Sequence, residues 1–155
     1  MNKSQRSLQE EYEKVFHSTQ DAMFLIQVID ENHFKYLRNN KAHQTTTGIS
    51  CAYLRGRTPQ ELVGNELGNT VAANYRRCLE QSGPISYEET LDLPGGKRTW
   101  QTTLTPVIQD GRPVLIVGSS QDITERKQAE QDLERERALL VRCLGQYPGG
   151  HYHLR

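Results

Sequence analysis

The stretch from Val114 to Arg126 constrains the fold of this chain most, because it begins as a strand and ends as a helix. Residues 114–117 form a short apolar run rich in β-branched side chains, which predicts a buried strand. Asp122, with Glu125 three residues later, has the pattern of a capping box at a helix start. We therefore expect a compact sheet domain joined to one exposed helix, an arrangement that favours signal transmission over catalysis.

The bulk properties exclude several classes of protein. The chain has 155 residues and a net charge of zero, so no global field attracts nucleic acid or an anionic membrane. No apolar run approaches the roughly 18 to 20 residues of a membrane span, and the first residues lack the apolar segment of a secretory signal. Cys51, Cys78 and Cys143 are far apart, which is typical of reduced thiols. We expect a cytoplasmic protein with no nucleic-acid partner and no membrane span.

The pattern of the central region predicts an α+β fold. A short helix is expected at 42–47, capped by Asn39 or Asn40 and ended by Gly48. A second short helix is expected to begin at Thr58-Pro59 and to run to Val63. A longer helix is predicted at 68–80. Alternating residues and turn signals place strands at 22–30, 33–37, 85–93, 98–108 and 114–120. The strands predict a five-stranded antiparallel sheet with the short helices on one face.

A helix is predicted on each side of this domain. In residues 2–18 the apolar positions Leu8, Tyr12 and Val15 form a narrow stripe, which favours contact with a second copy; the alternative is a helix lying on its own domain. The helix after Asp122 carries a sparse apolar stripe on a highly charged surface. We favour a parallel coiled coil over a lone linker helix, because so polar a helix gains little stability alone.

Short sequence motifs, together with the order of the predicted strands and helices, resemble a PAS domain over roughly residues 10 to 145. Its middle is matched by Asn39, Asn40, Ala42, Thr47-Gly48, Gly56-Arg57 and Glu61-Leu62-Val63-Gly64. Its last hairpin is matched by Glu88–Leu91, Gly95-Gly96-Lys97, Trp100, Leu104-Thr105-Pro106 and Asp110-Gly111, and its exit by Asp122–Lys127. The resemblance implies a sensory module of a larger bacterial protein, a histidine kinase or a diguanylate cyclase, that dimerises through its flanking helices.

The resemblance also implies a division of the chain. Residues 1–19 are a flanking helix, 20–121 the sensor domain, 122–145 a signalling helix and 146–155 a disordered tail. The residues expected to pass the signal to an output domain are Asp122, Ile123, Thr124 and Glu125.

The resemblance implies a cavity that can hold flavin, haem, a small metabolite or nothing. Comparison with the family's motifs bears on flavin and on haem. Pro59 in Gly56-Arg57-Thr58-Pro59 stands where photosensory relatives have a reactive cysteine, and Ser120 stands where they have a glutamine. The helix predicted at 68–80 has no histidine to bind haem, which leaves only His43 as a candidate iron ligand. Flavin and haem are therefore disfavoured, the cofactor stays unknown, and no metal site is expected.

A small-molecule site is predicted on the inward face of the sheet. If Ser120 points inward, alternation turns Ile116 and Gly118 inward too. The expected ligand-binding residues are Phe24, Ile26, Tyr75, Leu79, Trp100, Thr102, Leu104, Ile116, Gly118 and Ser120. The alternative is that these side chains only fill the core, as in a ligand-free interaction module.

No catalytic residues are predicted. Glu88 and Glu89 point to opposite faces of a strand, so they do not pair as acid and base. An enzyme would need buried carboxylates or histidines with perturbed pKa values in the cavity, and the sequence offers few candidates.

Overall fold

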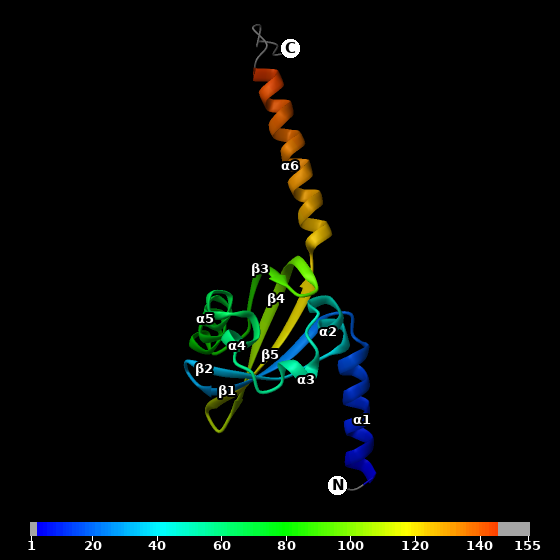
Figure 1. Cartoon of the computed structure of the whole chain (residues 1–155), viewed down its shortest axis with the longest axis vertical. Helices are drawn as coiled ribbons and strands as arrows, with labels where there is room; N and C mark the ends of the chain where they lie inside the picture. The colour runs from blue at the N-terminus through cyan, green and yellow to red at the C-terminus, as the bar shows by residue number, and fades with distance from the viewer. Residues whose placement is uncertain (1–2, 146–155) are drawn as a thin grey trace. The chain divides into compact units, whose positions relative to one another are not determined.

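The structure is a computed structural model that describes residues 3–145, in two compact units. The first unit ends at Asp122 and contains the sheet; the second starts at Ile123 and consists, among the described residues, of helix α6 (Thr124–Gly145) (Figure 1). The predicted tail at 146–155 lies outside the described residues.

The sheet is five-stranded and antiparallel throughout, which confirms the predicted fold class. Its order is β2-β1-β5-β4-β3, so β5 lies at the centre, between β1 and β4. The two strands predicted at 22–30 and 85–93 have those bounds, whereas the other three are longer than predicted because pairing extends them into the turns. The strands are β1 (Ala22–Asp30), β2 (His33–Asn39), β3 (Ile85–Leu93), β4 (Gly96–Gln109) and β5 (Arg112–Asp122).

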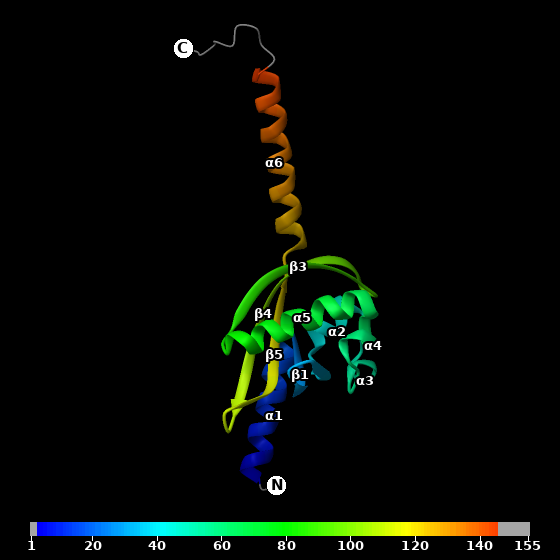
Figure 2. The ribbon, with the colours of Figure 1, turned by 90° about the vertical axis from the view of Figure 1, so that its left-hand side faces the viewer.

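Short helices cover one face of this sheet, and the longest of them crosses it (Figure 2). The helices of the first unit are α1 (Lys3–Ser18), α2 (Lys41–Thr47), α3 (Cys51–Leu54), α4 (Pro59–Val63) and α5 (Asn65–Gln81). Asn40 caps α2 and Gly48 ends it in the left-handed conformation, as predicted. The Thr58 and Glu61 side chains form a capping box at the start of α4.

Two features of this helical layer differ from the prediction. Helix α3 is a single turn capped by Ser50, too short for an apolar period to reveal it. Helix α5 starts at Asn65 instead of residue 68, so Gly68 lies inside the helix. A side chain there would overlap the backbone of Gln60, so the glycine permits α4 and α5 to pack closely. Its packing role, rather than a helix end, explains its position.

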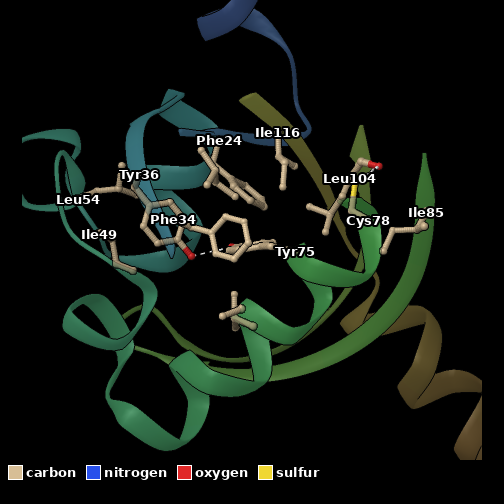
Figure 3. Close-up of a cluster of buried hydrophobic side chains, with 13 residues drawn as sticks. Phe24, Phe34, Tyr36, Ile49, Leu54, Tyr75, Cys78, Ile85, Leu104 and Ile116 are labelled. Carbon is tan, nitrogen blue, oxygen red and sulfur yellow. Dashed lines mark hydrogen bonds between the residues drawn. The ribbon is translucent and has the colours of Figure 1, made fainter. Parts of the chain in front are cut away.

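The core lies between the helices and the inward face of the sheet. Trp100, Thr102 and Leu104 of β4 are buried, as are the inward residues of β5 that alternation predicts, Ile116, Gly118 and Ser120. The main apolar cluster, most of which is labelled in Figure 3, consists of Phe24, Ile26, Phe34, Tyr36, Ile49, Leu54, Val71, Ala72, Tyr75, Cys78, Ile85, Leu104 and Ile116.

Helix α1 is attached to the sheet domain by polar contacts. The fully buried Asn40 donates hydrogen bonds to the carbonyls of Phe16 and Asp21, both at 2.9 Å. The Arg38 guanidinium donates two bonds to the Glu13 carboxylate, at 2.6 and 2.9 Å, and lies over the Phe16 ring. No residue of α1 is buried, and its predicted stripe of Leu8, Tyr12 and Val15 is exposed.

No helix within residues 3–145 combines the length and apolar character needed to cross a membrane.

Candidate functional site

A cavity of about 50 Å³ lies between the helical layer and the sheet. Side chains from all five strands border it on one side, and side chains from α2, α4 and α5 border it on the other. The residues that line it are Phe24, Tyr36, His43, Thr47, Ile49, Leu62, Val63, Leu67, Val71, Tyr75, Glu89, Leu91, Leu93, Trp100 and Ser120. The lining is mostly apolar with a few polar groups, which is the usual build of a ligand site.

The structure brings four of the ten predicted ligand-binding residues to this cavity: Phe24, Tyr75, Trp100 and Ser120. Three others, Ile26, Leu104 and Ile116, are completely buried in the surrounding core. The last three are Thr102, which bonds to Ser120, Gly118, which supports the Phe24 ring, and Leu79, which packs at the edge of the core.

Gly118 matters because of its close approach to Phe24. The two residues are cross-strand partners, and a methyl group on Gly118 would overlap the aromatic ring. The absence of a side chain therefore lets the far end of the ring lie against the backbone of Gly118.

A short chain of hydroxyl groups links the last strand to a carboxyl group. The hydroxyls of Thr102 and Ser120 are 2.8 Å apart, and Thr102 Oγ1 donates to Glu89 Oε1 at 3.3 Å. Burial raises the pKa of Glu89 from its ordinary value of 4.5 to about 7, and the bond from Thr102 opposes that rise. Glu89 is therefore poised to gain or lose a proton near neutral pH.

His43 lines the same cavity as a neutral ring, because burial lowers its pKa from 6.5 to about 4. Asn39 Nδ2 contacts His43 Nδ1 at 2.9 Å and donates to the Ile49 carbonyl at 3.0 Å. Since a carbonyl can only accept, the amide atom is a donor and Nδ1 is the acceptor. The proton of the ring consequently lies on Nε2, which has no partner among the described residues.

Two buried tyrosines complete the polar groups of the cavity. The hydroxyls of Tyr36 and Tyr75 are 2.7 Å apart (Figure 3), and burial raises the pKa of both phenols above the ordinary value. Both tyrosines therefore stay protonated at neutral pH.

Sequence reasoning undervalued the two ionisable groups of the cavity. Alternation along residues 85–93 puts Glu89 on the same face as Ile85 and Tyr87, and the burial pattern of β3 agrees. The alternation of β3 could therefore have indicated that Glu89 faces the cavity. His43 was weighed only as an iron ligand. The structure places two such groups in the cavity, Glu89 and His43, each with a pKa shifted by burial.

A family model described as PAS fold matches residues 16–128. The chain belongs to the PAS-fold family. The predicted resemblance is thereby confirmed. Members of this family are regulatory rather than catalytic. None of the curated proteins compared with the chain matches it.

Solved structures show the same fold. This PAS domain is similar to an RNA-binding light-oxygen-voltage receptor at 20% identity and a TM-score of 0.71, over 96% of this chain and 40% of that one. It is similar to a PAS domain from Colwellia psychrerythraea at 19% identity and a TM-score of 0.61, over 76% and 98% of the two chains. The PAS domain of Bordetella pertussis BvgS has 21% identity and a TM-score of 0.57, over 85% and 97%.

The residues expected to carry the signal lie where the first unit of this PAS domain ends. Asp122 is the last residue of β5, and its Oδ2 atom accepts a hydrogen bond from Arg98 Nη1 of β4 at 2.7 Å. The Ile123 carbonyl accepts from the Lys127 N–H, Thr124 begins α6 and Glu125 lies in its first turn. The capping box predicted from Asp122 and Glu125 stays a prediction.

Residues 3–145 contain no cluster of three or more His, Cys, Asp or Glu side chains that could bind a metal ion. Pro59 is buried at the start of α4.

Proposed function

We propose that this PAS domain is the sensory module of a multidomain bacterial signalling protein, of the histidine kinase or diguanylate cyclase type. It binds a small molecule in the cavity and passes a conformational signal to an output domain through the helix after Asp122. The division into a flanking helix at 1–19, a sensor at 20–121 and a signalling helix at 122–145 belongs to this proposal, as does a cytoplasmic location. The chain spans 40% of the length of the light-oxygen-voltage receptor, which is consistent with a part of a longer protein.

The observation that carries the proposal is the position of Ser120. This residue lines the cavity on the central strand of the sheet, and β5 ends only two residues later, at Asp122. A ligand that changes the position of Ser120 acts on the same strand that leads into α6. Arg98, through its bond to Asp122, couples β4 to this strand end.

The signal is then a shift of population. A ligand favours whichever arrangement of the sheet binds it more tightly, and the helix reports that shift. Its effect on the output is limited by the difference between its affinities for the two arrangements.

A thermal-shift screen of the purified protein against a metabolite library tests the sensor function. A cavity ligand raises the melting temperature progressively with concentration. A visible absorption spectrum and native mass spectrometry of the protein as isolated would reveal a flavin, a haem or a retained small molecule. A flat response to the whole library, with no retained molecule, contradicts the sensor proposal.

Gly118→Ala should close the cavity. The new methyl group forces the Phe24 ring out of its place against β5, and the adjacent free space lies in the cavity. We expect a loss of about 2 kcal/mol in the free energy of unfolding, typical of overpacking, and no ligand-dependent rise in melting temperature. Gly83→Ala is the matched control, since its nearest heavy atom is 3.8 Å away. Ligand binding retained by Gly118→Ala would place the ligand outside this cavity.

Asp122→Ala tests the division between sensor and signalling helix. The substitution removes the bond from Arg98, and we expect a loss of about 1 kcal/mol in stability measured by urea unfolding. Ligand affinity should stay within about twofold, because Asp122 does not line the cavity. The double variant with Arg98→Ala measures the coupling between the two residues. A collapse of ligand affinity would make the strand end part of the binding site.

A second candidate function is a ligand-free dimerisation module, and the flanking helices favour it. Apolar side chains stay exposed on α1 (Leu8, Tyr12, Val15) and on α6 (Leu133, Leu139, Leu140, Val141, Leu144). A homodimer in which each stripe meets its copy would bury them, as in the coiled coil expected for α6. Sedimentation equilibrium distinguishes this dimer from a monomer.

A further inference from the structure

We propose that the cavity is a site for a small organic cation, such as a primary ammonium ion, which the Glu89 carboxylate binds among aromatic side chains. The inference rests on the proposed sensor function and specifies the chemical class of its ligand. It begins from a carboxylate that has no counter-ion.

Glu89 is the only acidic residue among those described as lining the cavity, and none of those residues is lysine or arginine. Within the described chain it accepts a single hydrogen bond, from Thr102 at 3.3 Å. A carboxylate has about four acceptor positions, so most of its capacity is free for a ligand. Buried charges in proteins are normally paired, and the missing partner here is a cation.

The charged and titratable groups around Glu89 supply no such partner. Burial raises the pKa of Tyr36 on β2, of Tyr75 on α5 and of Tyr87 on β3, and the negative charge of Glu89 adds to each rise. These three phenols therefore stay neutral beside it. His43 on α2 is neutral as well. Arg77 of α5 lies over the Tyr87 ring at 5.3 Å and does not line the cavity.

Aromatic rings provide the second part of the site. Phe24, Tyr36, Tyr75 and Trp100 line the cavity together with Glu89, and Trp100 is the cross-strand partner of Glu89. Directly opposite residues on one face of a sheet have neighbouring side chains, so the indole lies beside the carboxyl group. Aromatic faces attract cations, and most strongly where water is excluded. A carboxylate beside aromatic rings disfavours an anion.

The volume limits the ligand to a few non-hydrogen atoms. A cavity of 150 Å³ accommodates benzene, whereas this one measures about 50 Å³. Ethylammonium, with three non-hydrogen atoms, is a suitable probe. Ethanol and acetate are its neutral and anionic counterparts of similar size. A ligand this small binds no more tightly than roughly millimolar.

The test is a titration of the ¹⁵N-labelled protein with each of the three probes, followed by amide chemical shifts at pH 6 and pH 8. Because only ionised Glu89 binds the cation, we expect ethylammonium to bind about tenfold more tightly at pH 8 than at pH 6. Glu89→Gln should weaken its binding at pH 8 by about tenfold or more. Glu88→Gln removes the same charge from the exposed face of the same strand, and we expect a change within about twofold.

Each other outcome overturns the cation site. Ethanol or acetate binding as tightly as ethylammonium shows that the cavity selects a different class of ligand, while the sensor function stands. Equal affinity at both pH values, or unchanged binding by Glu89→Gln, shows that the carboxylate is not the contact. No shift with any probe overturns the site for small cations, and the metabolite screen then decides the sensor function separately.

Discussion

Glu89→Gln should stabilise this PAS domain by about 3 kcal/mol at pH 8 and leave its stability nearly unchanged at pH 4.5. In the folded protein burial raises the pKa of Glu89 from 4.5 to about 7, so the folded state holds its proton more strongly than the unfolded state. The stability that this proton contributes is fully present below pH 4.5 and is lost as the pH rises through 7. Glutamine cannot ionise, so the Glu89→Gln protein does not lose this stability as the pH rises.

Urea unfolding of both proteins at the two pH values measures this effect as a difference, which cancels the titration of other groups. The glutamine carbonyl can still accept the bond that Thr102 donates to Glu89. Glu88→Gln, on the exposed face of β3, should change stability by less than about 0.5 kcal/mol at either pH. A destabilised Glu89→Gln at pH 8 would mean that the folded protein stabilises the charged carboxylate.

Asn40→Ala should destabilise the first unit by roughly 3 to 5 kcal/mol, the sum of a lost helix cap and of buried backbone groups left unpaired. Asn40 is completely buried and uses every hydrogen-bonding position of its amide. Its oxygen accepts from the N–H groups of Met23 and His43, and its nitrogen donates to the carbonyls of Phe16 and Asp21, all at 2.9 Å. One side chain thus joins α1, β1 and α2.

Chemical denaturation followed by circular dichroism measures the loss. Asn65→Ala, at an exposed position at the start of α5, is the matched control and should cost less than about 0.5 kcal/mol. We also expect the amides of α1 to exchange faster in Asn40→Ala, because the bonds that attach the end of this helix are gone. A loss below about 1 kcal/mol would mean that water replaces the four bonds.

The elements of the fold that the sequence predicted well are those specified locally. The strands at 22–30 and 85–93, the cap at Asn40 and the Thr58 capping box depend on alternation and on side chains three residues apart. The late start predicted for the longer helix has its cause in packing. The helix predicted at 68–80 begins at Asn65, and the close contact of Gly68 with the backbone of Gln60 that allows this arises only after folding.

For the candidate site, alternation determined which residues point inward but not which of them border free space. Phe24, Tyr75, Trp100 and Ser120 reach the cavity, whereas Ile26 and Leu104 have the same inward direction and are enclosed by the core. The alternation of side chains along a strand shows which face of the sheet a residue is on, but not whether its side chain borders the cavity or is enclosed by the core.

The sequence by itself indicated the family, through the resemblance of its motifs to a PAS domain. It also predicted the order of the strands and of every helix but α3, and the inward register of β5, because these follow from local propensity and spacing. Only the tertiary structure decided that Glu89 and His43 meet in one cavity, where the pKa of Glu89 is about 7 and that of His43 about 4. The reason is desolvation: it arises from side chains on β1, β2, β4 and α5 that are distant in the chain and meet only after folding.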